Sequence, residues 1–235
     1  MSNHPTRLIT PHPDLQVTLV DTGAGDRTVL ALHGGSGPGG ITPVIDHYAT
    51  SARVLAPTHP GWSGTLRPPW FTGVDNLAIT YLDVLEDEAL DDVTVIASSF
   101  GGWVASEMAV RDRGQRLSRV VLLDGIGPLI DGYQVQMPQP QPGRGLSQSD
   151  LENSRAYTGT SMNDPQLLRR LSRGRVPALL IWGEEDTIVP PGFGKTYARA
   201  FAHARFTTVP GAGHMPALQA PDTTFGIIDT FLRTS

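Results

Sequence analysis

The sequence predicts a single α/β domain in which a mostly parallel sheet is covered by helices on both faces. One observation is a set of short apolar runs without polar alternation, which is typical of strands buried on both sides. These runs are Thr28–Leu32, Val93–Ile96, Val120–Leu123 and Ala178–Trp182. The other observation is that segments of helical periodicity separate such runs, most clearly Val74–Ala89. Since 235 residues can bury a substantial core as one unit, we expect residues 1–235 to form one domain.

The first part of the chain is predicted to contribute four strands. Leu8–Thr10 and Gln16–Val20 are short β-prone runs, and the polar, glycine-containing stretch Asp21–Asp26 predicts the turn after them. Thr28–Leu32 ends at a cluster of glycines, and Arg53–Ala56 ends at a proline. Both of these strands should therefore lead directly into loops.

The later elements repeat a strand followed by a helix. Val93–Ile96 is a β-branched run bounded by acidic turn residues, and Trp103–Arg111 places its apolar side chains on one helical face. Val120–Leu123, Ala178–Trp182 and Arg205–Val209 are the strands that follow. In open sheets of this kind ligands bind outside the carboxyl ends of the strands. The loops after the strands are therefore where we expect the functional residues.

Composition excludes several classes of function. A net charge of −5 and a pI near 5.7 give no basic footprint for nucleic acid or an anionic membrane surface. The chain has no cysteine, which excludes disulfides and thiolate chemistry. No stretch approaches the roughly 18 consecutive apolar residues of a membrane span, and the first residues lack the apolar core of a secretory signal. We expect a soluble, cytoplasmic protein whose partner is a small molecule, and the sequence leaves its oligomeric state open.

Ser99 lies between a predicted buried strand and a predicted helix. Ala97 and Gly101 flank it at two residues' distance and leave room for a sharp turn that exposes the hydroxyl. Ser98 fits less well, because Ile96 and Phe100 would then crowd the turn. The first N–H groups of the following helix, including that of Phe100, would point toward negative charge beside Ser99. Ser99 is therefore a candidate nucleophile, although a serine that merely caps a strand is an alternative.

The glycine-rich stretch His33–Gly40 allows three interpretations. Gly35, Gly37 and Gly40 match the G-x-G-x-x-G pattern of dinucleotide sites, but no Asp or Glu occurs between Asp46 and Asp75 to hold a ribose hydroxyl. We therefore expect no nucleotide cofactor. The second interpretation is an oxyanion-hole loop in which an N–H near Gly35 approaches a tetrahedral intermediate beside Ser99. The third is an ordinary turn.

An acid and a base follow Ser99 in the chain at the same predicted edge of the sheet. Asp186 lies in the loop after Ala178–Trp182, and His214 lies in the glycine-rich loop after Arg205–Val209. A serine hydroxyl is a weak nucleophile, so it needs an imidazole to take its proton and a carboxylate to orient that imidazole. These three residues have the chemistry of a Ser-His-Asp triad. We expect His33 to hydrogen-bond and shape its glycine loop and His59 to lie at the pocket rim. The remaining histidines follow no metal-ligand spacing, and we expect no metal.

The chain resembles the α/β-hydrolases. The resemblance is carried by five motifs in a family-specific order, which are LHGGSGPGG at Leu32–Gly40, APTHPGWSG at Ala56–Gly64, IASSFGG at Ile96–Gly102, LLIWGEEDTIVP at Leu179–Pro190 and VPGAGHMP at Val209–Pro216. It implies an eight-stranded sheet, Ser99 as nucleophile, Asp186 as orienting acid, His214 as base and no cofactor. It also implies an oxyanion hole formed by the N–H groups of Gly35 and Phe100.

The sequence departs from the family pattern in two places and leaves the acid open. Ala97 stands where the family most often has glycine, and Thr58-His59 stands where Asp-x-x-Gly is frequent. Alanine still fits a tight turn. Three other carboxylates compete with Asp186 for the role of the acid. They are the adjacent Glu184 and Glu185, and Asp124 at the end of an earlier strand.

Residues 125–175 break the alternation of strands and helices, and in the family an insertion here forms a cap over the active site. This cap is short and rich in proline at Met137–Gly145, and only Ser149–Tyr157 and Pro165–Leu171 suit short helices. We expect a fairly open site. Candidate apolar walls of the substrate pocket include Trp62, Ile126, Tyr133 and Met215.

These observations predict a serine hydrolase that cleaves an ester, thioester or lactone of a small to medium acyl compound through an acyl-enzyme. A carbon–carbon bond hydrolase acting on a vinylogous diketone is an alternative suggested by HGGSGPGG, although such relatives usually carry a tryptophan after the histidine, where this chain has Met215. A cofactor-free haloperoxidase or perhydrolase would use the same residues. From a different class, a ligand-binding or cyclisation protein could retain the triad by descent.

Overall fold

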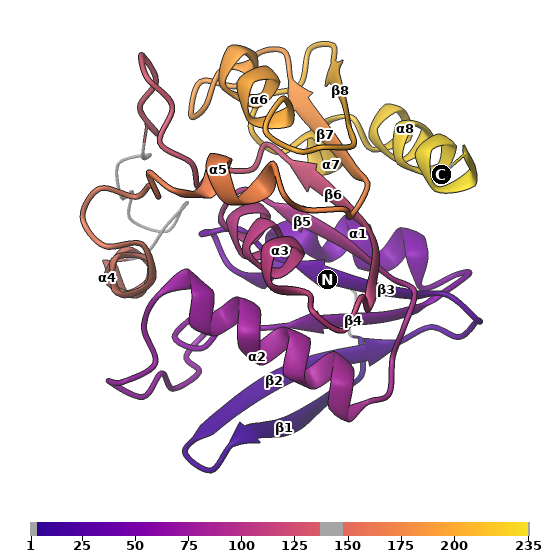
Figure 1. The fold of residues 1–235 in the computed structure, drawn as a ribbon. Helices are drawn as coiled ribbons and strands as arrows, with labels where there is room; N and C mark the ends of the chain where they lie inside the picture. The colour runs from indigo at the N-terminus through magenta and orange to yellow at the C-terminus, as the bar shows by residue number, and fades with distance from the viewer. Residues whose placement is uncertain (1–3, 137–147, 235) are drawn as a thin grey trace.

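The computed structural model describes residues 4–136 and 148–234, and Figure 1 shows a central sheet with helices on its faces. The strands are β1 (Thr6–His12), β2 (Leu15–Thr22), β3 (Thr28–Leu32), β4 (Arg53–Pro57), β5 (Val93–Ser98), β6 (Leu117–Leu123), β7 (Ala178–Gly183) and β8 (Ala204–Val209). The helices are the 3₁₀-helix η1 (Pro38–Ile41) and α1 (Thr42–Tyr48), α2 (Val74–Asp87), α3 (Phe100–Arg111), α4 (Gln148–Thr158), α5 (Leu167–Leu171), α6 (Pro191–Ala198), α7 (Pro216–Gln219) and α8 (Pro221–Thr234).

The eight strands form one sheet in the order β1-β2-β4-β3-β5-β6-β7-β8. β1 and β2 pair antiparallel and β2 pairs antiparallel with β4, whereas all pairs from β4 to β8 are parallel. The mostly parallel α/β fold predicted from the sequence is confirmed. Parallel pairing brings the carboxyl ends of β3, β5, β6, β7 and β8 to one edge, and this edge carries the candidate site.

The buried strands are apolar throughout because they separate two cores. Along β5, Val93, Val95 and Ala97 join the core under α2, α3 and α6, whereas Ile96 joins the core under α1 and α8. Successive side chains of a strand point to opposite faces, so a strand covered on both sides needs apolar residues at every position. Figure 1 shows α2, α3 and α5 on the near face of the sheet.

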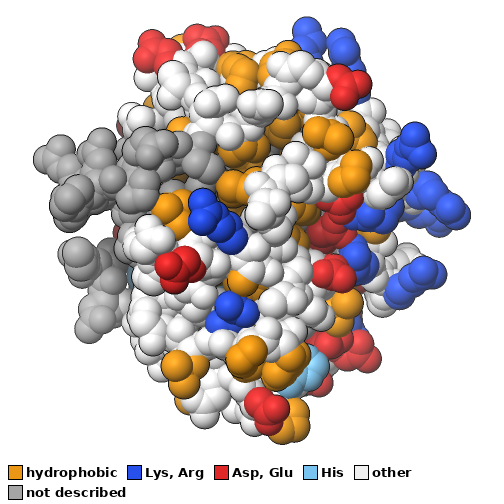
Figure 2. Space-filling view, turned by 90° about the vertical axis from the view of Figure 1, so that its left-hand side faces the viewer, with side chains coloured by type: hydrophobic (Ala, Val, Ile, Leu, Met, Phe, Trp, Pro, Cys, Tyr) orange, Lys and Arg blue, Asp and Glu red, His pale blue; other side chains and the backbone are white. Residues whose placement is uncertain are grey.

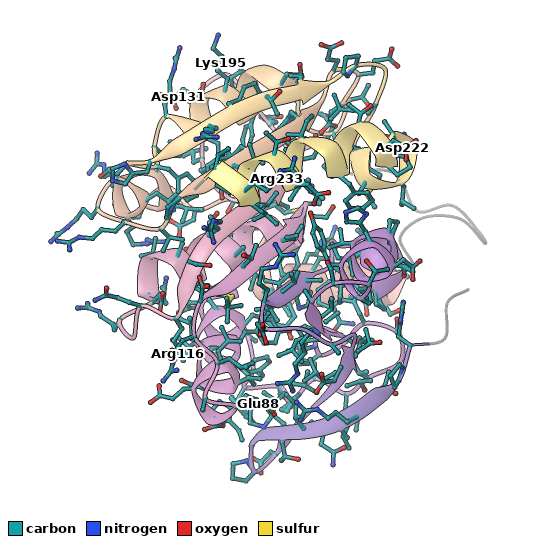
Figure 3. All side chains as sticks on the ribbon, turned by 90° about the vertical axis from the view of Figure 1, so that its right-hand side faces the viewer. Glu88, Arg116, Asp131, Lys195, Asp222 and Arg233 are labelled. Atoms are coloured by element: carbon teal, nitrogen blue, oxygen red, sulfur yellow. The ribbon has the colours of Figure 1, made fainter. Side chains whose placement is uncertain are left out.

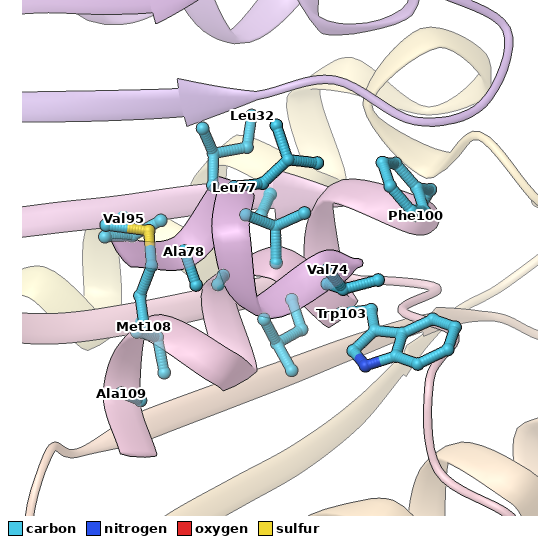
Figure 4. Close-up of a cluster of buried hydrophobic side chains, with 14 of the residues drawn as sticks. Leu32, Val74, Leu77, Ala78, Val95, Phe100, Trp103, Met108 and Ala109 are labelled. Atoms are coloured by element: carbon cyan, nitrogen blue, oxygen red, sulfur yellow. The ribbon is translucent and has the colours of Figure 1, made fainter. Parts of the chain in front are cut away.

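The core between α2 and α3 lies directly behind Ser99. Figure 4 shows Leu77 and Ala78 of α2 packed near Val95 of β5 and Met108 of α3, with Phe100 and Trp103 toward the carboxyl end of the strand. Burying one large apolar side chain of this kind contributes about 1.5–3 kcal/mol. The first turn of α3 is thus anchored by the same side chains that fill the core.

The boundaries of several elements differ from the sequence prediction for local reasons. β2 continues through Asp21 and Thr22, which pair with Leu55 and Val54 of β4, so the turn begins later than expected. α3 begins at Phe100 rather than Trp103 because the chain turns sharply at Ser99. In the segment between β6 and β7, α4 matches the first expected helix, whereas α5 begins only at Leu167. The proline-rich stretch Met137–Gly145 lies outside the described residues.

Most charged side chains lie at the periphery, and Glu107, Asp124 and Asp186 are buried exceptions. Figure 3 shows Glu88, Arg116, Lys195 and Asp222 at the outside of the molecule. Glu88 belongs to a surface network in which Arg7 and Arg53 also bind Asp21. Within residues 4–136 and 148–234, no helix is long and apolar enough to cross a membrane.

Candidate active site

Ser99 occupies the sharp turn between β5 and α3. Its backbone has φ 51° and ψ −114°, a conformation that costs energy for a residue with a Cβ. The turn is held because the Ser99 N–H donates to the carbonyl of Leu123 at 2.9 Å. It also requires glycine two residues later, since a Cβ on Gly101 would lie 2.5 Å from the carbonyl oxygen of Leu32. Ser98 is instead the buried last residue of β5.

The structure brings Ser99, His214 and Asp186 into one hydrogen-bonded chain. The Nε2 atom of His214 lies 2.8 Å from the Ser99 Oγ, and its Nδ1 lies 2.8 Å from the Asp186 Oδ2. A carboxylate only accepts, so Nδ1–H donates to Asp186, and in a neutral ring Nε2 accepts the proton of Ser99. This arrangement can remove the hydroxyl proton as the oxygen attacks a carbonyl carbon.

Asp186 is held by its own loop. Its Oδ1 accepts the N–H groups of Ile188 at 2.8 Å and Val189 at 3.1 Å, which leaves Oδ2 for His214. Burial alone would raise the pKa of Asp186, but the hydrogen bond and charge of His214 and the two N–H groups hold it below its ordinary value. The side chain is therefore a carboxylate at neutral pH.

The other candidate acids do not bond to His214. Asp124 directly follows β6 and lies near Asp186, but it accepts the N–H of Gly183 at 2.9 Å. Glu184 and Glu185 are exposed, and Glu184 accepts a bond from Thr208. Atoms of Asp124, Asp186 and His214 lie within 4.8 Å of one another, which is the kind of cluster that can hold a metal ion. Both ring nitrogens of His214 are already bonded to Asp186 and Ser99, so we assign the cluster to hydrogen bonding. We call Asp124, Asp186 and His214 the carboxyl–histidine group.

The predicted oxyanion donors lie on either side of Ser99. Phe100 is the first residue of α3, so its N–H has no acceptor within the helix. On the other side, Gly34 packs against Ser99 so closely that a Cβ on it would lie 3.1 Å from the serine Cβ. The Gly35 N–H belongs to the next peptide of this loop. The residues expected to form an oxyanion hole thus surround one small space at the serine.

Two buried histidines and a tyrosine form a hydrogen-bond network that holds the glycine loop at Gly34. The His59 N–H donates to Nε2 of His33 at 3.0 Å, so the neutral His33 ring carries its proton on Nδ1 and donates it to the Gly34 carbonyl at 2.7 Å. The His59 Nε2 donates to the His33 carbonyl at 3.0 Å, and the Tyr81 hydroxyl donates to Nδ1 of His59 at 2.6 Å. Because the Gly34 carbonyl and the Gly35 N–H share one peptide plane, this network fixes the direction of the Gly35 N–H, the predicted oxyanion donor.

We call His33, His59 and Tyr81 the neutral histidine group. All three are at most 2 % exposed. Burial lowers the pKa of His33 to about 4, and burial together with His33 lowers the pKa of His59 well below its ordinary value. The expected role of His33 in shaping the glycine loop is confirmed by its bond to Gly34, whereas His59 is fully buried rather than at the pocket rim. Sequence analysis did not join the two histidines and Tyr81 into one group. A usable signal existed, since His33 and His59 follow β3 and β4, which are parallel neighbours.

The pocket at Ser99 is small and apolar. Its volume is about 90 Å³, and its lining within the described residues contains no Asp, Glu, Lys or Arg. The lining residues are Gly34, Gly35, Ser36, Ser99, Phe100, Ile126, Val135, Ser154, Met162, Ile188, His214 and Met215. Figure 2 views the molecule from the left-hand side of Figure 1, and most Lys and Arg side chains visible there gather along one edge of that face.

Two of the four predicted pocket walls lie elsewhere. Ile126 and Met215 line the pocket. Trp62 is fully buried because its indole N–H donates to the Gly35 carbonyl at 2.7 Å and its ring stacks on Phe100. Tyr133 lines a neighbouring cavity that shares Val135, Ser154 and Met162 with the pocket. Trp62 thus supports the glycine loop and Tyr133 lies further out.

Comparison with known proteins identifies the family. The model of the alpha/beta hydrolase family matches residues 29–161 and 146–226. The chain belongs to this family. The structure of this alpha/beta hydrolase is similar to that of a thermophilic esterase from Thermogutta terrifontis, with a TM-score of 0.79 and 20% identity over 97% of this chain and 98% of the esterase. It is also similar to a variant of a meta-cleavage product hydrolase, with a TM-score of 0.78 and 19% identity over 99% and 98% of the two chains.

Two curated relatives of this alpha/beta hydrolase are named as hydrolases of 2-hydroxy-6-oxo compounds. A 2-hydroxy-6-oxononadienedioate/2-hydroxy-6-oxononatrienedioate hydrolase from Paraburkholderia phymatum is 26% identical over 86% of this chain and 85% of its own length. A 2-hydroxy-6-oxo-2,4-heptadienoate hydrolase from Pseudomonas putida is 34% identical over 50% of this chain and 45% of its own length. The protein is therefore a hydrolase, and the bond that it cleaves remains to be inferred.

Proposed function

We propose that this hydrolase cleaves a carbon–carbon bond beside a ketone in a small enol-ketone, with Ser99 as the nucleophile. The compounds in the relatives' names contain hydroxy, oxo and carboxylate groups but no ester or amide, so the bond that a hydrolase can break there is the one beside the ketone. This observation favours the carbon–carbon alternative over the ester hydrolase that the sequence analysis put first. The Ser99–His214–Asp186 chain supplies the attacking group for either bond.

The reaction follows from the contacts at Ser99. As Oγ attacks the ketone carbon, the hydroxyl proton passes to Nε2 of His214, and the Gly35 and Phe100 N–H groups stabilise the oxyanion. When the carbonyl re-forms, the carbon–carbon bond breaks. Its electron pair is delocalised onto the conjugated part of the substrate, which takes the proton held by His214 and leaves the ring neutral again. Water then hydrolyses the acyl-enzyme with His214 as base, releases the carboxylic acid and restores Ser99.

A carboxylic ester is the second candidate, favoured by the chemistry of the pocket. The substrates in the relatives' names carry one or two carboxylates, yet the described lining of the pocket offers no Lys or Arg to bind them. A neutral ester with a short acyl chain needs no such partner. A volume of about 90 Å³ favours an acyl group of only a few carbons.

Steady-state kinetics on two substrate classes tests the proposal. The purified protein is assayed with 2-hydroxy-6-oxohepta-2,4-dienoate, whose absorbance is lost on cleavage, and with p-nitrophenyl esters of increasing acyl length. We expect kcat/KM for the dienoate to exceed that for every ester by about 10²-fold, and Ser99→Ala to abolish both. Ester turnover without cleavage of the dienoate would contradict the carbon–carbon assignment and support the second candidate.

Chemical labelling separates failure of the substrate choice from failure of the mechanism. A fluorophosphonate probe should form one adduct, located on Ser99 by peptide mapping, and the adduct should be absent from His214→Ala. An unlabelled Ser99 in the folded native protein would overturn the role of nucleophile for both substrate classes.

A further inference from the structure

Asp124 is a buried carboxyl group that the proposed reaction does not use. It directly follows β6 with φ 48°, is 0% exposed, and its backbone N–H donates to the Ile181 carbonyl at 3.0 Å. Its Oδ1 accepts the Gly183 N–H at 2.9 Å. Its Oδ2 is buried and has no hydrogen-bond partner in the described part of the chain. A buried oxygen of this kind costs stability unless it is satisfied or protonated.

The titratable groups that face Asp124 are Asp186 from the loop after β7 and His214 from the loop after β8. Atoms of all three side chains lie within 4.8 Å of one another. The available donors favour Asp186, which receives N–H groups from His214, Ile188 and Val189, whereas Asp124 receives one from Gly183. Two buried carboxylates this close cannot both ionise cheaply. The proton therefore belongs on Asp124.

We propose that Asp124 is a neutral carboxylic acid that donates its Oδ2 proton to the carboxylate of Asp186 and so holds Asp186 in place for His214. Asp124 is then a positioning residue, because it acts on the reaction only through Asp186. The inference rests on the proposed role of the Ser99–His214–Asp186 chain. The protonation itself has independent support, since burial and the negative charge of Asp186 raise the pKa of Asp124 well above its ordinary value.

Infrared spectroscopy of the resting protein tests the protonation without any substrate. The difference spectrum between the native protein and Asp124→Asn at pH 7.5 should show the carbonyl stretch of one protonated carboxylic acid in the native protein only. This readout does not depend on activity, so it remains informative if the proposed function fails. A spectrum that shows loss of an ionised carboxylate instead would overturn the proposal.

Kinetics of two variants tests the positioning role. Asp124→Asn keeps an acceptor for Gly183 and an N–H donor for Asp186, so it should retain kcat within about threefold and leave the pH profile unchanged. Asp124→Ala removes the donor, and loss of a hydrogen bond to a charged group should lower kcat about tenfold or more. The rate of fluorophosphonate labelling of Ser99 should be nearly unchanged in Asp124→Asn and lower in Asp124→Ala. This rate tests the positioning role without a substrate.

Three outcomes would overturn the proposal. If Asp124 is ionised, Asp124→Asn removes a negative charge near His214 and moves the acid limb of the pH profile to lower pH. If Asp124 serves only the Gly183 N–H, the Asn variant should behave like the native protein and folded Asp124→Ala should keep full kcat. If the cluster binds a cation, Zn²⁺ or Mg²⁺ alone should raise the Tm of the native protein but not of Asp124→Asn.

Discussion

The carboxyl–histidine group and the neutral histidine group flank Ser99 from opposite sides, and both are networks of titratable side chains. In the first, His214 keeps 18% of its side-chain surface exposed and binds the carboxylate of Asp186 at 2.8 Å. In the second, His33 and His59 are 0% exposed, and their side chains hydrogen-bond to backbone groups and to the Tyr81 hydroxyl. A carboxylate partner and partial exposure stabilise the charged form of an imidazole ring, whereas burial beside neutral groups stabilises the neutral form.

The difference assigns separate tasks to similar residues. His214 can take and return a proton during the reaction, because Asp186 stabilises the charged ring that forms. His33 and His59 stay neutral and fix the direction of a peptide plane at the glycine loop. We therefore expect the carboxyl–histidine group to transfer the proton and the neutral histidine group to orient the peptide at Gly34. The predictions below test this division of roles.

The largest expected effect is on hydrolysis when His214 is removed. His214→Ala leaves Ser99 without a base and should lower kcat by on the order of 10⁴-fold to 10⁶-fold. His33→Asn is the matched variant in the other group, because its amide can still donate to the Gly34 carbonyl. It should lose less than about 10²-fold, since removing an oxyanion donor outright costs about 10²-fold to 10³-fold. Initial rates on the better substrate class, with circular dichroism as a check on folding, measure both. Equal losses of kcat in the two variants would show that His214 and His33 do not have different roles.

Local rules were enough to predict the position of Ser99. Alternation of buried runs and amphipathic segments located the strands, and β3 has the predicted ends Thr28 and Leu32, with the glycine-rich loop starting at His33. The small residues Ala97 and Gly101 marked the turn, and the structure shows why Gly101 has no room for a side chain. Features set by neighbouring residues in the chain are readable from sequence in this way.

Strand order let the sequence bring Ser99, Asp186 and His214 to one edge, but individual side-chain contacts between distant elements were not readable. The sequence placed Trp62 in a pocket wall, but its partners Gly35 and Phe100 lie 27 and 38 positions away and draw it into the core. Tyr81 looked like one apolar position of a helical stripe, and nothing local indicates that its hydroxyl reaches His59. Asp124 and Asp186 both follow strands, so only the geometry at His214 separates them.

The second prediction concerns stability at acidic pH. The pKa of His33 falls from an ordinary 6.5 to about 4 on folding, so between these values the unfolded chain binds the proton and the folded chain does not. The contribution of His33 is therefore complete above about pH 6.5 and is lost as pH falls toward 4, which amounts to on the order of 3 kcal/mol. His59 acts in the same direction. Urea unfolding at pH 8, 6 and 4.5 measures the loss.

His33→Asn should flatten this acid dependence, and the carboxyl–histidine group should not account for it. The pKa of Asp186 is lowered from 3.8, so its stabilisation is lost only as pH falls through and below that value. Asp124 has the opposite sign, because its raised pKa makes the folded chain bind a proton that the unfolded chain lacks in this range, so it gains stability as pH falls. Asp186→Asn should therefore not reduce the loss of stability between pH 6.5 and 4. If Asp186→Asn removes the slope and His33→Asn does not, the neutral histidine group is not the acid-sensitive element.

The smallest expected effect comes from Tyr81→Phe, which removes one hydroxyl from the neutral histidine group. The buried Nδ1 of His59 then loses the Tyr81 hydroxyl as its hydrogen-bond donor, and this should cost about 1–2 kcal/mol of unfolding free energy at pH 8. Tyr197→Phe is the matched control, because that buried hydroxyl donates to Ser106 at 2.7 Å and lies outside both groups at Ser99. The two variants should lose similar stability by urea unfolding, but only Tyr81→Phe should also lower kcat, by a few-fold. If kcat responds equally in both, the tyrosine hydroxyl serves packing alone, and the aiming of the Gly35 N–H must rest on His33 and His59.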